Sequence, residues 1–188
     1  EKPFTIGLTG QTGAGKGYVG KYLKELGFNI LDTDIYARKV TEKNSPYLSI
    51  LAEHFGKDII ENGCLNRQLL ADRAFSSREN TEKLNAITHP AIIELCKKDA
   101  EFPSVFDAPL LFECKGNEQC YKTIAVIAPA DIRKKRIMAR DSITTEQAEA
   151  RMNAQKSETF YKTNSDFTVI NDGRDIKVQI NNILEEIL

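Results

Sequence analysis

A glycine-rich segment near the N-terminus is the strongest chemical signal in the sequence. It follows an apolar run over residues 4–9 and has the spacing GxxxxGK, ending at Lys16, before a stretch with helical periodicity. Glycines let consecutive backbone N–H groups turn toward one point, and the helix start and the Lys16 ammonium add positive charge. This pattern predicts a loop that binds the phosphates of a nucleotide. The residues expected to contact the nucleotide are Gly10, Gln11, Thr12, Gly13, Ala14, Gly15, Lys16, Gly17 and Tyr18.

The residue after Lys16 departs from the usual pattern. Phosphate-binding loops of this kind carry Ser or Thr there, whose hydroxyl ligates Mg²⁺, but this chain has Gly17. Phosphate binding depends mainly on the backbone and on Lys16, so we expect it to persist. The missing metal ligand must come from water or from another group, and Gly17 therefore places metal affinity and turnover in question.

Two carboxylates follow the second apolar run, which covers residues 28–31. Asp32 and Asp34 stand where a parallel strand would end, and that edge of an open α/β sheet lines the ligand crevice. A carboxylate there can accept the proton of an acceptor hydroxyl during phosphoryl transfer. Capping of the following helix explains the same residues equally well. Arg38 comes four residues after Asp34, so it can pair with Asp34 or hold an anionic group of a substrate.

A third acidic position, Asp107, ends an apolar run over residues 104–106. An acid at the end of such a strand lies near the phosphates, which makes Asp107 the candidate ligand of Mg²⁺, either directly or through water. The next segment is apolar and ends in a carboxylate. It comprises Pro109, Leu110, Leu111, Phe112 and Glu113. Its composition favours a wall of an acceptor pocket and ordinary core packing equally.

Basic side chains are concentrated in residues 131–156. The segment holds seven Lys or Arg and four Asp or Glu, a net charge of +3, whereas the whole chain has a formal net charge of −1. A basic helical pair is typical of a lid that closes over phosphates and offsets charge in the transition state. Arg140 is the side chain that we expect to reach inward. A solvated basic helix face is the alternative.

The elements that must position these residues alternate along the chain. Short apolar runs typical of buried strands cover residues 4–9, 28–31, 104–106, 123–127 and 166–170. Helical periodicity covers residues 16–26, 33–42, 131–140, 145–156 and 175–188, and residues 46–102 look almost wholly helical. This alternation predicts an α/β fold, a three-layer sandwich with a five-stranded parallel sheet. The long helical stretch is predicted to be an insertion after the second strand.

Length and composition set the limits of this interpretation. The chain has 188 residues, 41% hydrophobic and 28% charged, as in an average globular domain. A balance of 26 basic against 27 acidic residues argues against general nucleic-acid binding, and the apolar runs are far shorter than the roughly 20 residues that span a bilayer. No signal peptide and no paired cysteine motif are recognisable, so we expect a cytoplasmic monomer with reduced cysteines and no membrane partner.

Other proteins with such a loop would carry further signatures. A GTP-dependent switch would have DxxG and, late in the chain, NKxD, and a transporter ATPase would have an LSGGQ-like motif; the sequence contains none of these. The short chain and the acidic residues after the second strand favour a small-molecule kinase instead.

Seven motifs occur in order along essentially the whole chain. They are Gly7-Leu8-Thr9-Gly10 through Lys16, Asp32-Thr33-Asp34 with Arg38, His89-Pro90, the segment from Pro109 to Glu113, Arg140-Asp141, Ala154-Gln155 and Asn171. Together they resemble the dephospho-CoA kinase family, which completes coenzyme A biosynthesis. The resemblance implies transfer of the γ-phosphoryl group of ATP, with Mg²⁺, to the ribose 3′-hydroxyl of dephospho-CoA. It also implies a P-loop NTPase core over about 1–32, 103–130 and 164–188, a helical CoA-substrate subdomain over about 33–102 and a lid over about 131–163.

The resemblance further implies residue roles. Asp34 would be the general base, and Lys16 and Arg140 would stabilise charge. The acceptor site would comprise Thr9, Asp32, Asp34, Arg38, His89, Pro109, Leu110, Leu111 and Glu113. Asn171 would lie near the adenine of ATP. His89 could instead be a helix-terminal histidine before Pro90, and Asn171 an ordinary turn residue.

Two other functions stay open at this point. Gly17 would also suit a nucleotide- or CoA-binding protein with impaired catalysis. A different small-molecule P-loop kinase, acting on a nucleoside or a shikimate-like acceptor, would share the same loop and the same general architecture.

Overall fold

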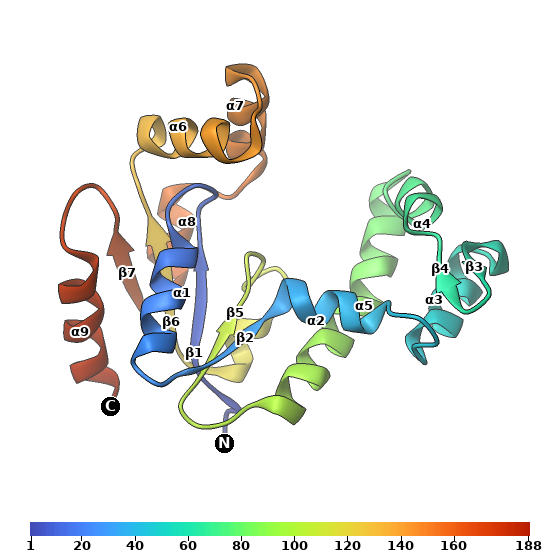
Figure 1. Ribbon diagram of the computed structural model, residues 1–188, viewed down its shortest axis with the longest axis horizontal. Helices are drawn as coiled ribbons and strands as arrows, with labels where there is room; N and C mark the ends of the chain where they lie inside the picture. The colour runs from blue at the N-terminus through green and yellow to red at the C-terminus, as the bar shows by residue number, and fades with distance from the viewer. The chain divides into compact units, whose positions relative to one another are not determined.

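The computed structural model describes residues 1–188, and the chain divides into two compact units (Figure 1). One unit contains residues 1–30 and 100–188, and we call it the core unit. The other contains residues 31–99, and we call it the helical unit. None of the helices is long and apolar enough to cross a membrane.

A five-stranded sheet organises the core unit, with the strand order β2-β5-β1-β6-β7. The strands are β1 (Phe4–Gly10), β2 (Asn29–Asp32), β5 (Ser104–Asp107), β6 (Cys120–Ile127) and β7 (Phe167–Ile170). β1 pairs in parallel with β5 and β6, and β6 pairs in parallel with β7. Every residue of β1 is buried, because this central strand is covered on both faces. The predicted five-stranded parallel sheet is confirmed.

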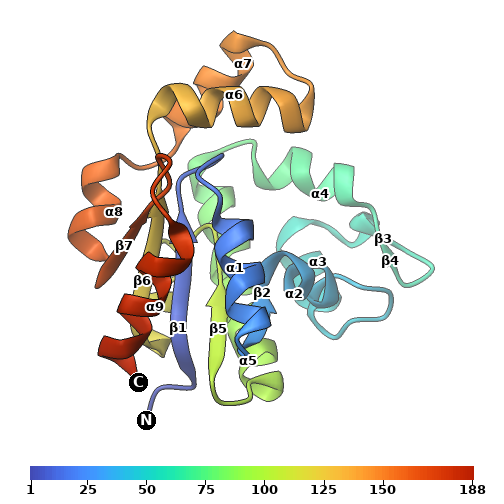
Figure 2. The same cartoon turned by 60° about the vertical axis from the view of Figure 1, so that its left-hand side comes forward.

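Helices cover both faces of this sheet. Side chains alternate between the faces of a strand. Ile124 and Val126 of β6 pack with α1 (Lys16–Glu25) and α9 (Ile176–Ile187), which lie in front of the strands in Figure 2. Ala125 and Ile127 point the other way and pack with Tyr161 of α8 (Glu158–Asn164). The sandwich therefore has three layers, as predicted.

The segment between β6 and β7 contains three helices. α6 (Ala130–Asp141) and α7 (Thr145–Ala154) pack against each other, and we call them the basic helix pair. α8 is a separate helix that lies on β6 and β7, as the burial of Tyr161 shows. The range 131–163 expected for the lid thus includes one helix that belongs to the packed layers of the core unit.

The helical unit is built mainly from four helices. They are α2 (Thr33–Val40), α3 (Tyr47–Phe55), α4 (Arg67–Ala74) and α5 (Arg78–Asp99). Residues of α3, α4 and the segment between them form a buried core, and Leu84 and Ile87 of α5 pack against it. Its members are Leu48, Leu51, Phe55, Ile59, Leu70 and Ala74. Tyr36 of α2 donates a hydrogen bond of 2.5 Å to Asp99 of α5, so α2 is tied to the longest helix of the unit.

A small antiparallel hairpin interrupts the stretch that the sequence predicts to be almost wholly helical. After a 3₁₀ turn (η1, Lys57–Ile59), β3 (Ile60–Glu61) and β4 (Cys64–Leu65) pair around a two-residue turn. Asn62 and Gly63 in that turn have φ values of 52° and 77°, the left-handed region that such hairpins require. The helical prediction is wrong here, because an Asn-Gly pair is itself a strong hairpin signal.

The histidine-proline motif lies in the interior of a helix. α5 runs from Arg78 to Asp99 with Pro90 inside it. His89 is half-buried and does not end the helix. The alternative interpretation of His89 as a helix-terminal residue is therefore wrong.

Candidate phosphate-binding site

The glycine-rich loop joins the end of β1 to the start of α1, as its sequence predicts. Gly13 and Gly15 have φ values of 75° and 100°, which only glycine adopts at little cost. The N–H groups of Gly13, Gly15, Lys16 and Gly17 donate to no acceptor within the protein. No side chain caps the start of α1, and its first turn carries no acidic residue. The loop therefore presents several N–H donors and the positive end of a helix dipole to an anion.

The charge of Lys16 is paired with a carboxylate on a neighbouring strand. The Lys16 ammonium forms an ion pair with the carboxylate of Asp107, at the end of β5. The two strands hold these residues together, because Leu8 of β1 and Asp107 are register partners. Both side chains are largely buried, with 22% and 12% of their surfaces exposed. Asp107 thus keeps the Lys16 charge at the loop in the absence of phosphate.

The donor set offers Mg²⁺ one protein carboxylate. Mg²⁺ takes oxygen ligands and usually keeps several waters. Asp107 can supply a carboxylate oxygen at the loop, whereas Gly17 supplies none, and no group of three or more His, Cys, Asp or Glu forms a metal site elsewhere. This donor set fits a Mg²⁺ ion that is held mainly by phosphates and water.

Space around Gly17 is open. The residue is exposed, and a Cβ atom added to it would meet no heavy atom within 4 Å. Its φ is not in the left-handed region, unlike that of Gly15. Nothing in the local structure therefore requires glycine at this position.

Two side chains from distant elements donate to the carbonyl groups of the loop. Asn171, directly after β7, donates from Nδ2 to the carbonyl oxygen of Ala14 at 2.8 Å. Arg136 of α6 donates from Nη1 to the carbonyl oxygens of Gly13 and Ala14, both at 3.3 Å. A Cβ at Gly15 would lie 2.5 Å from Nδ2 of Asn171, so this glycine allows the close approach. Asn171 thus contacts the phosphate loop, and its predicted place near the adenine of ATP stays a prediction.

Two glutamine side chains, one in the phosphate loop and one at the end of α7, accept hydrogen bonds from backbone N–H groups. Gln11, which is almost fully buried, accepts a hydrogen bond of 3.2 Å from the N–H of Ala128. Gln155, at the end of α7, accepts one of 2.6 Å from the N–H of Thr12. Sequence reasoning assigned no site role to Arg136 or Gln155. Gln155 belongs to the Ala154-Gln155 motif that contributes to the family resemblance, whereas for Arg136 the only signal was its position in the basic segment.

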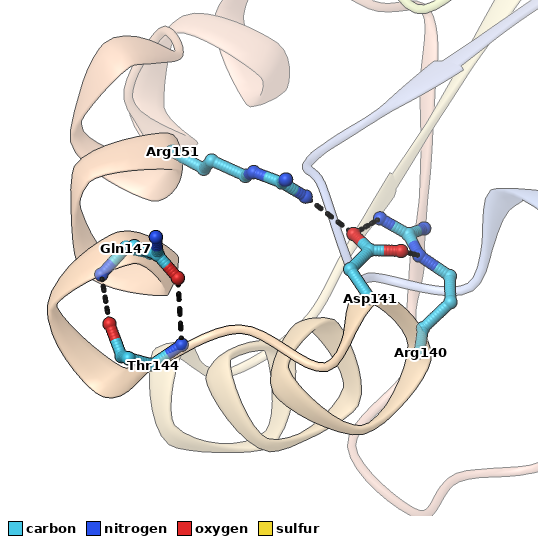
Figure 3. Close-up of polar contacts among 5 residues, drawn as sticks. All are labelled: Arg140, Asp141, Thr144, Gln147 and Arg151. Atoms are coloured by element: carbon cyan, nitrogen blue, oxygen red, sulfur yellow. Dashed lines mark hydrogen bonds and ion pairs between the residues drawn. The ribbon is translucent and has the colours of Figure 1, made fainter.

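Arg140 lies at the end of α6, away from the contacts just described. Its guanidinium makes two hydrogen bonds of 2.9 Å to Asp141, and Arg151 of α7 binds the same carboxylate (Figure 3). These hydrogen bonds raise the pKa of Arg140 and lower that of Asp141. Arg140 is 61% exposed in this arrangement. The expected inward reach of Arg140 is therefore not the arrangement that the structure describes.

Local hydrogen bonds stabilise the basic helix pair. Thr144 and Gln147 form a capping box at the start of α7, which satisfies backbone donors on both sides (Figure 3). Arg133 of α6 is buried and donates to the carbonyl oxygen of Ala128 at 3.0 Å. Burial lowers the pKa of Arg133. Arg133 anchors the pair, whereas Arg140 and Arg151 remain at its surface.

The predicted acidic pair and Arg38 lie in α2 or directly before it, and they differ in their surroundings. Asp32 accepts a hydrogen bond of 2.9 Å from the N–H of Asp34 and caps α2, so the capping interpretation is correct for Asp32. Asp34 is exposed in the first turn of the helix. Arg38 is exposed as well and forms no ion pair with Asp34. The carboxylate of Asp34 is thus available to a ligand.

The segment after β5 is partly packed in the core, whereas its predicted role as a wall of an acceptor pocket stays a prediction. Leu111 is fully buried in the core, and Phe112 packs edge-on against Phe160 of α8. Leu110, in contrast, is 51% exposed. Thr9 donates a hydrogen bond of 3.1 Å to the carbonyl oxygen of Pro109, which fixes the start of the segment at the end of β1. Glu113 is exposed.

Comparisons with known proteins agree on one family. A model of the family described as dephospho-CoA kinase matches residues 4–176. A dephospho-CoA kinase of Listeria innocua is 38% identical over 176 residues, which cover 89% of this chain and 88% of that protein. A dephospho-CoA kinase of Moorella thermoacetica is 41% identical over 165 residues, which cover 83% and 78% of the two chains.

Solved structures show the same fold. The crystal structure of TT1252 from Thermus thermophilus has a TM-score of 0.82 and 31% sequence identity, and the match covers 100% of both chains. A shikimate kinase from Bacteroides thetaiotaomicron has a TM-score of 0.56 at 15% identity over 97% of both chains, which shows a shared fold alone. The chain has the phosphate loop and matches the family model over residues 4–176. It therefore belongs to the dephospho-CoA kinase family.

Proposed function

We propose that this protein transfers the γ-phosphoryl group of ATP to the ribose 3′-hydroxyl of dephospho-CoA, giving CoA and ADP. The observation that carries the proposal is the phosphate loop of a chain that matches the family model over residues 4–176. The loop alone would suit many kinases. Family membership selects the acceptor among them.

ATP binding is assigned to the free N–H groups of the loop and to Lys16. Those N–H groups hold the phosphate oxygens, and the Lys16 ammonium exchanges its contact with Asp107 for one with the phosphates. Asn171 and Arg136 hold the loop carbonyls outward, which keeps the N–H groups directed at the anion. Mg²⁺, when bound, would offset charge on the phosphates, with Asp107 as its protein ligand, directly or through water.

Acceptor activation is assigned to the helical unit. Asp34 orients the 3′-hydroxyl and accepts its proton, because it is an exposed carboxylate without a protein partner. Asp32 supports it by capping α2, and Arg38 binds an anionic group of the acceptor. His89 is a further proposed acceptor contact of the helical unit. Thr9 and the exposed part of the segment from Pro109 to Glu113 are proposed acceptor contacts of the core unit. Arg140 leaves Asp141 and stabilises charge on the transferring group.

An acceptor-dependent assay tests this function. Purified protein is incubated with ATP, Mg²⁺ and dephospho-CoA, adenosine or shikimate, while ADP is measured enzymatically and CoA by mass spectrometry. We expect ADP and CoA in equal amounts with dephospho-CoA and neither product with the other acceptors. ATP binding without acceptor-dependent turnover would point to a binding protein, and turnover with another acceptor to a different kinase.

Location follows from the same proposal, because both substrates are small soluble molecules: we infer that the protein acts in the cytoplasm. We also propose that it is a monomer. Light scattering on the purified protein, at concentrations at which the activity is measured, checks the monomeric state.

A further inference from the structure

The contact between Gln155 and Thr12 joins two segments that are 143 residues apart in the sequence. Gln155 is the residue at which α7 ends, with an extended backbone (φ −83°, ψ 166°), and its own N–H bonds to Met152. The side chain is half-buried, and its oxygen lies 2.6 Å from the backbone nitrogen of Thr12. The contact is therefore a short, partly shielded hydrogen bond to the phosphate loop.

The N–H of Thr12 differs from the other donors of the loop. The N–H groups of Gln11 and Ala14 donate to backbone carbonyl oxygens. Those of Gly13, Gly15, Lys16 and Gly17 have no acceptor in the protein and are the ones proposed to bind phosphate. Thr12 alone among residues 11–17 donates its backbone N–H to a side chain. A phosphate can therefore bind the loop without displacing Gln155.

The basic helix pair is attached to the loop through both of its helices. Arg136 binds loop carbonyl oxygens from α6, and Gln155 binds a loop N–H at the end of α7. Beyond Gln155 the chain returns to the packed core through Tyr161 of α8. Arg140 and Arg151 lie between these two attachments in the sequence and share Asp141. The position of Arg140 thus depends on how the pair is fixed to the loop.

We propose that Gln155 is a positioning residue that holds the basic helix pair on the phosphate loop through the N–H of Thr12, so that Arg140 can reach the transferring phosphoryl group. The proposal rests on the proposed function for its kinetic consequence. The contact itself, and its effect on Arg140 when ATP binds, can be tested without turnover.

Three substitutions separate the acceptor oxygen from the size and charge of the side chain. Gln155→Leu keeps the approximate volume and removes the acceptor. Gln155→Glu keeps an acceptor oxygen at the same reach and adds a negative charge. Asn153→Leu makes a similar amide-to-leucine change at an exposed residue of the same helix, and it serves as the matched control.

Amide hydrogen exchange measured by NMR reads the contact directly. We expect the Thr12 amide to exchange at least about tenfold faster in Gln155→Leu than in the wild type, in line with the loss of one hydrogen bond. Its rate should change less than threefold in Gln155→Glu and Asn153→Leu. ATP should shift the amide signal of Arg140 in the wild type, and this shift should be reduced in Gln155→Leu. Unchanged exchange of Thr12, or an unchanged ATP response of Arg140, would overturn the proposal.

Kinetics provide the second test. We expect kcat of Gln155→Leu to fall about tenfold while KM for ATP changes less than threefold, since the phosphate donors of the loop are intact. Gln155→Glu should keep kcat within about threefold and raise KM for ATP, because its charge repels phosphate. Equal losses in Gln155→Leu and Asn153→Leu would mean that helix stability is responsible and would overturn the positioning role. If the wild type lacks dephospho-CoA kinase activity, the proposed function fails, and the exchange experiment still decides about the contact.

Discussion

Replacing Gly17 with serine tests how this chain manages without the usual hydroxyl ligand. The structure sets the steric expectation, because no heavy atom lies within 4 Å of a Cβ at this position and its φ is not left-handed. Serine should therefore enter the first turn of α1 without moving its neighbours. Its Oγ would add a ligand for Mg²⁺ beside the phosphate loop.

The magnitudes follow from local physical chemistry. Serine is favoured over glycine in a helix by about 0.5 kcal/mol, which raises the melting temperature by about 1–2 °C in a chain of this size. Changes around a metal site commonly alter metal affinity by 10–100-fold. We therefore expect the Mg²⁺ concentration for half-maximal activity to fall at least about tenfold in Gly17→Ser.

Gly17→Ala is the matched control for this experiment. Alanine gives a similar or larger gain in helix stability but has no hydroxyl, so its Mg²⁺ dependence should stay within about twofold of the wild type. The assay is initial-rate ADP release as a function of free Mg²⁺ at saturating ATP and dephospho-CoA, together with thermal unfolding of all three proteins. If serine and alanine give the same Mg²⁺ dependence, the reasoning that water replaces a missing ligand is refuted. A fall in melting temperature in both variants would refute the inferred open space.

Three further predictions concern two other residues of the site and one buried thiol outside it. Asp34→Asn should lower kcat by about 10²–10⁴-fold with little change in ATP affinity measured by calorimetry, whereas equal, modest losses in both would argue against a base role. Asn171→Ala removes the 2.8 Å hydrogen bond to buried Ala14 and should raise KM for ATP about five- to tenfold but leave KM for dephospho-CoA unchanged; an effect on the acceptor alone would contradict its role at the loop. Burial raises the pKa of the Cys120 thiol to about 12, so mass spectrometry after iodoacetamide treatment at pH 8 should find Cys64, which is exposed, labelled and Cys120 not. The raised pKa also means that the protonated thiol stabilises the fold below pH 9 and that this stabilisation is lost between about pH 9 and 12; labelling of Cys120 in the folded protein would contradict both statements.

Much of the fold could be predicted because its signals are local. The five mainly apolar runs become the strands of the sheet, and even Thr5 and Thr9 of β1 are buried because this strand is covered on both faces. The hairpin at Asn62-Gly63 carried an equally local signal, which the helical periodicity around it obscured. α8 was missed for a different reason: it has only seven residues, and its place is set by packing of Tyr161 on the sheet.

In the candidate site, too, features with a local signal could be predicted and features set by tertiary contacts could not. The phosphate loop was predicted from spacing alone, since its N–H groups, its glycines and Lys16 are consecutive in the chain. The spacing of Asp32 and Asp34 could not separate capping from catalysis, and the hydrogen bond to the N–H of Asp34 assigns the cap to Asp32. Composition could not tell which residues of the segment after β5 pack in the core. In the structure Leu111 is buried and Leu110 is exposed.

The sequence by itself determined that the chain carries a phosphate loop between a strand and a helix, with acids at the strand ends and a basic segment later in the chain. Only the tertiary structure decided what holds that loop. Arg136, Gln155 and Asn171 reach it from 122 to 157 residues away, and Asp107 reaches Lys16 from 91 residues away. No periodicity or spacing encodes such contacts, because they exist only where parallel strands and the helices between them bring distant segments to one edge of a sheet.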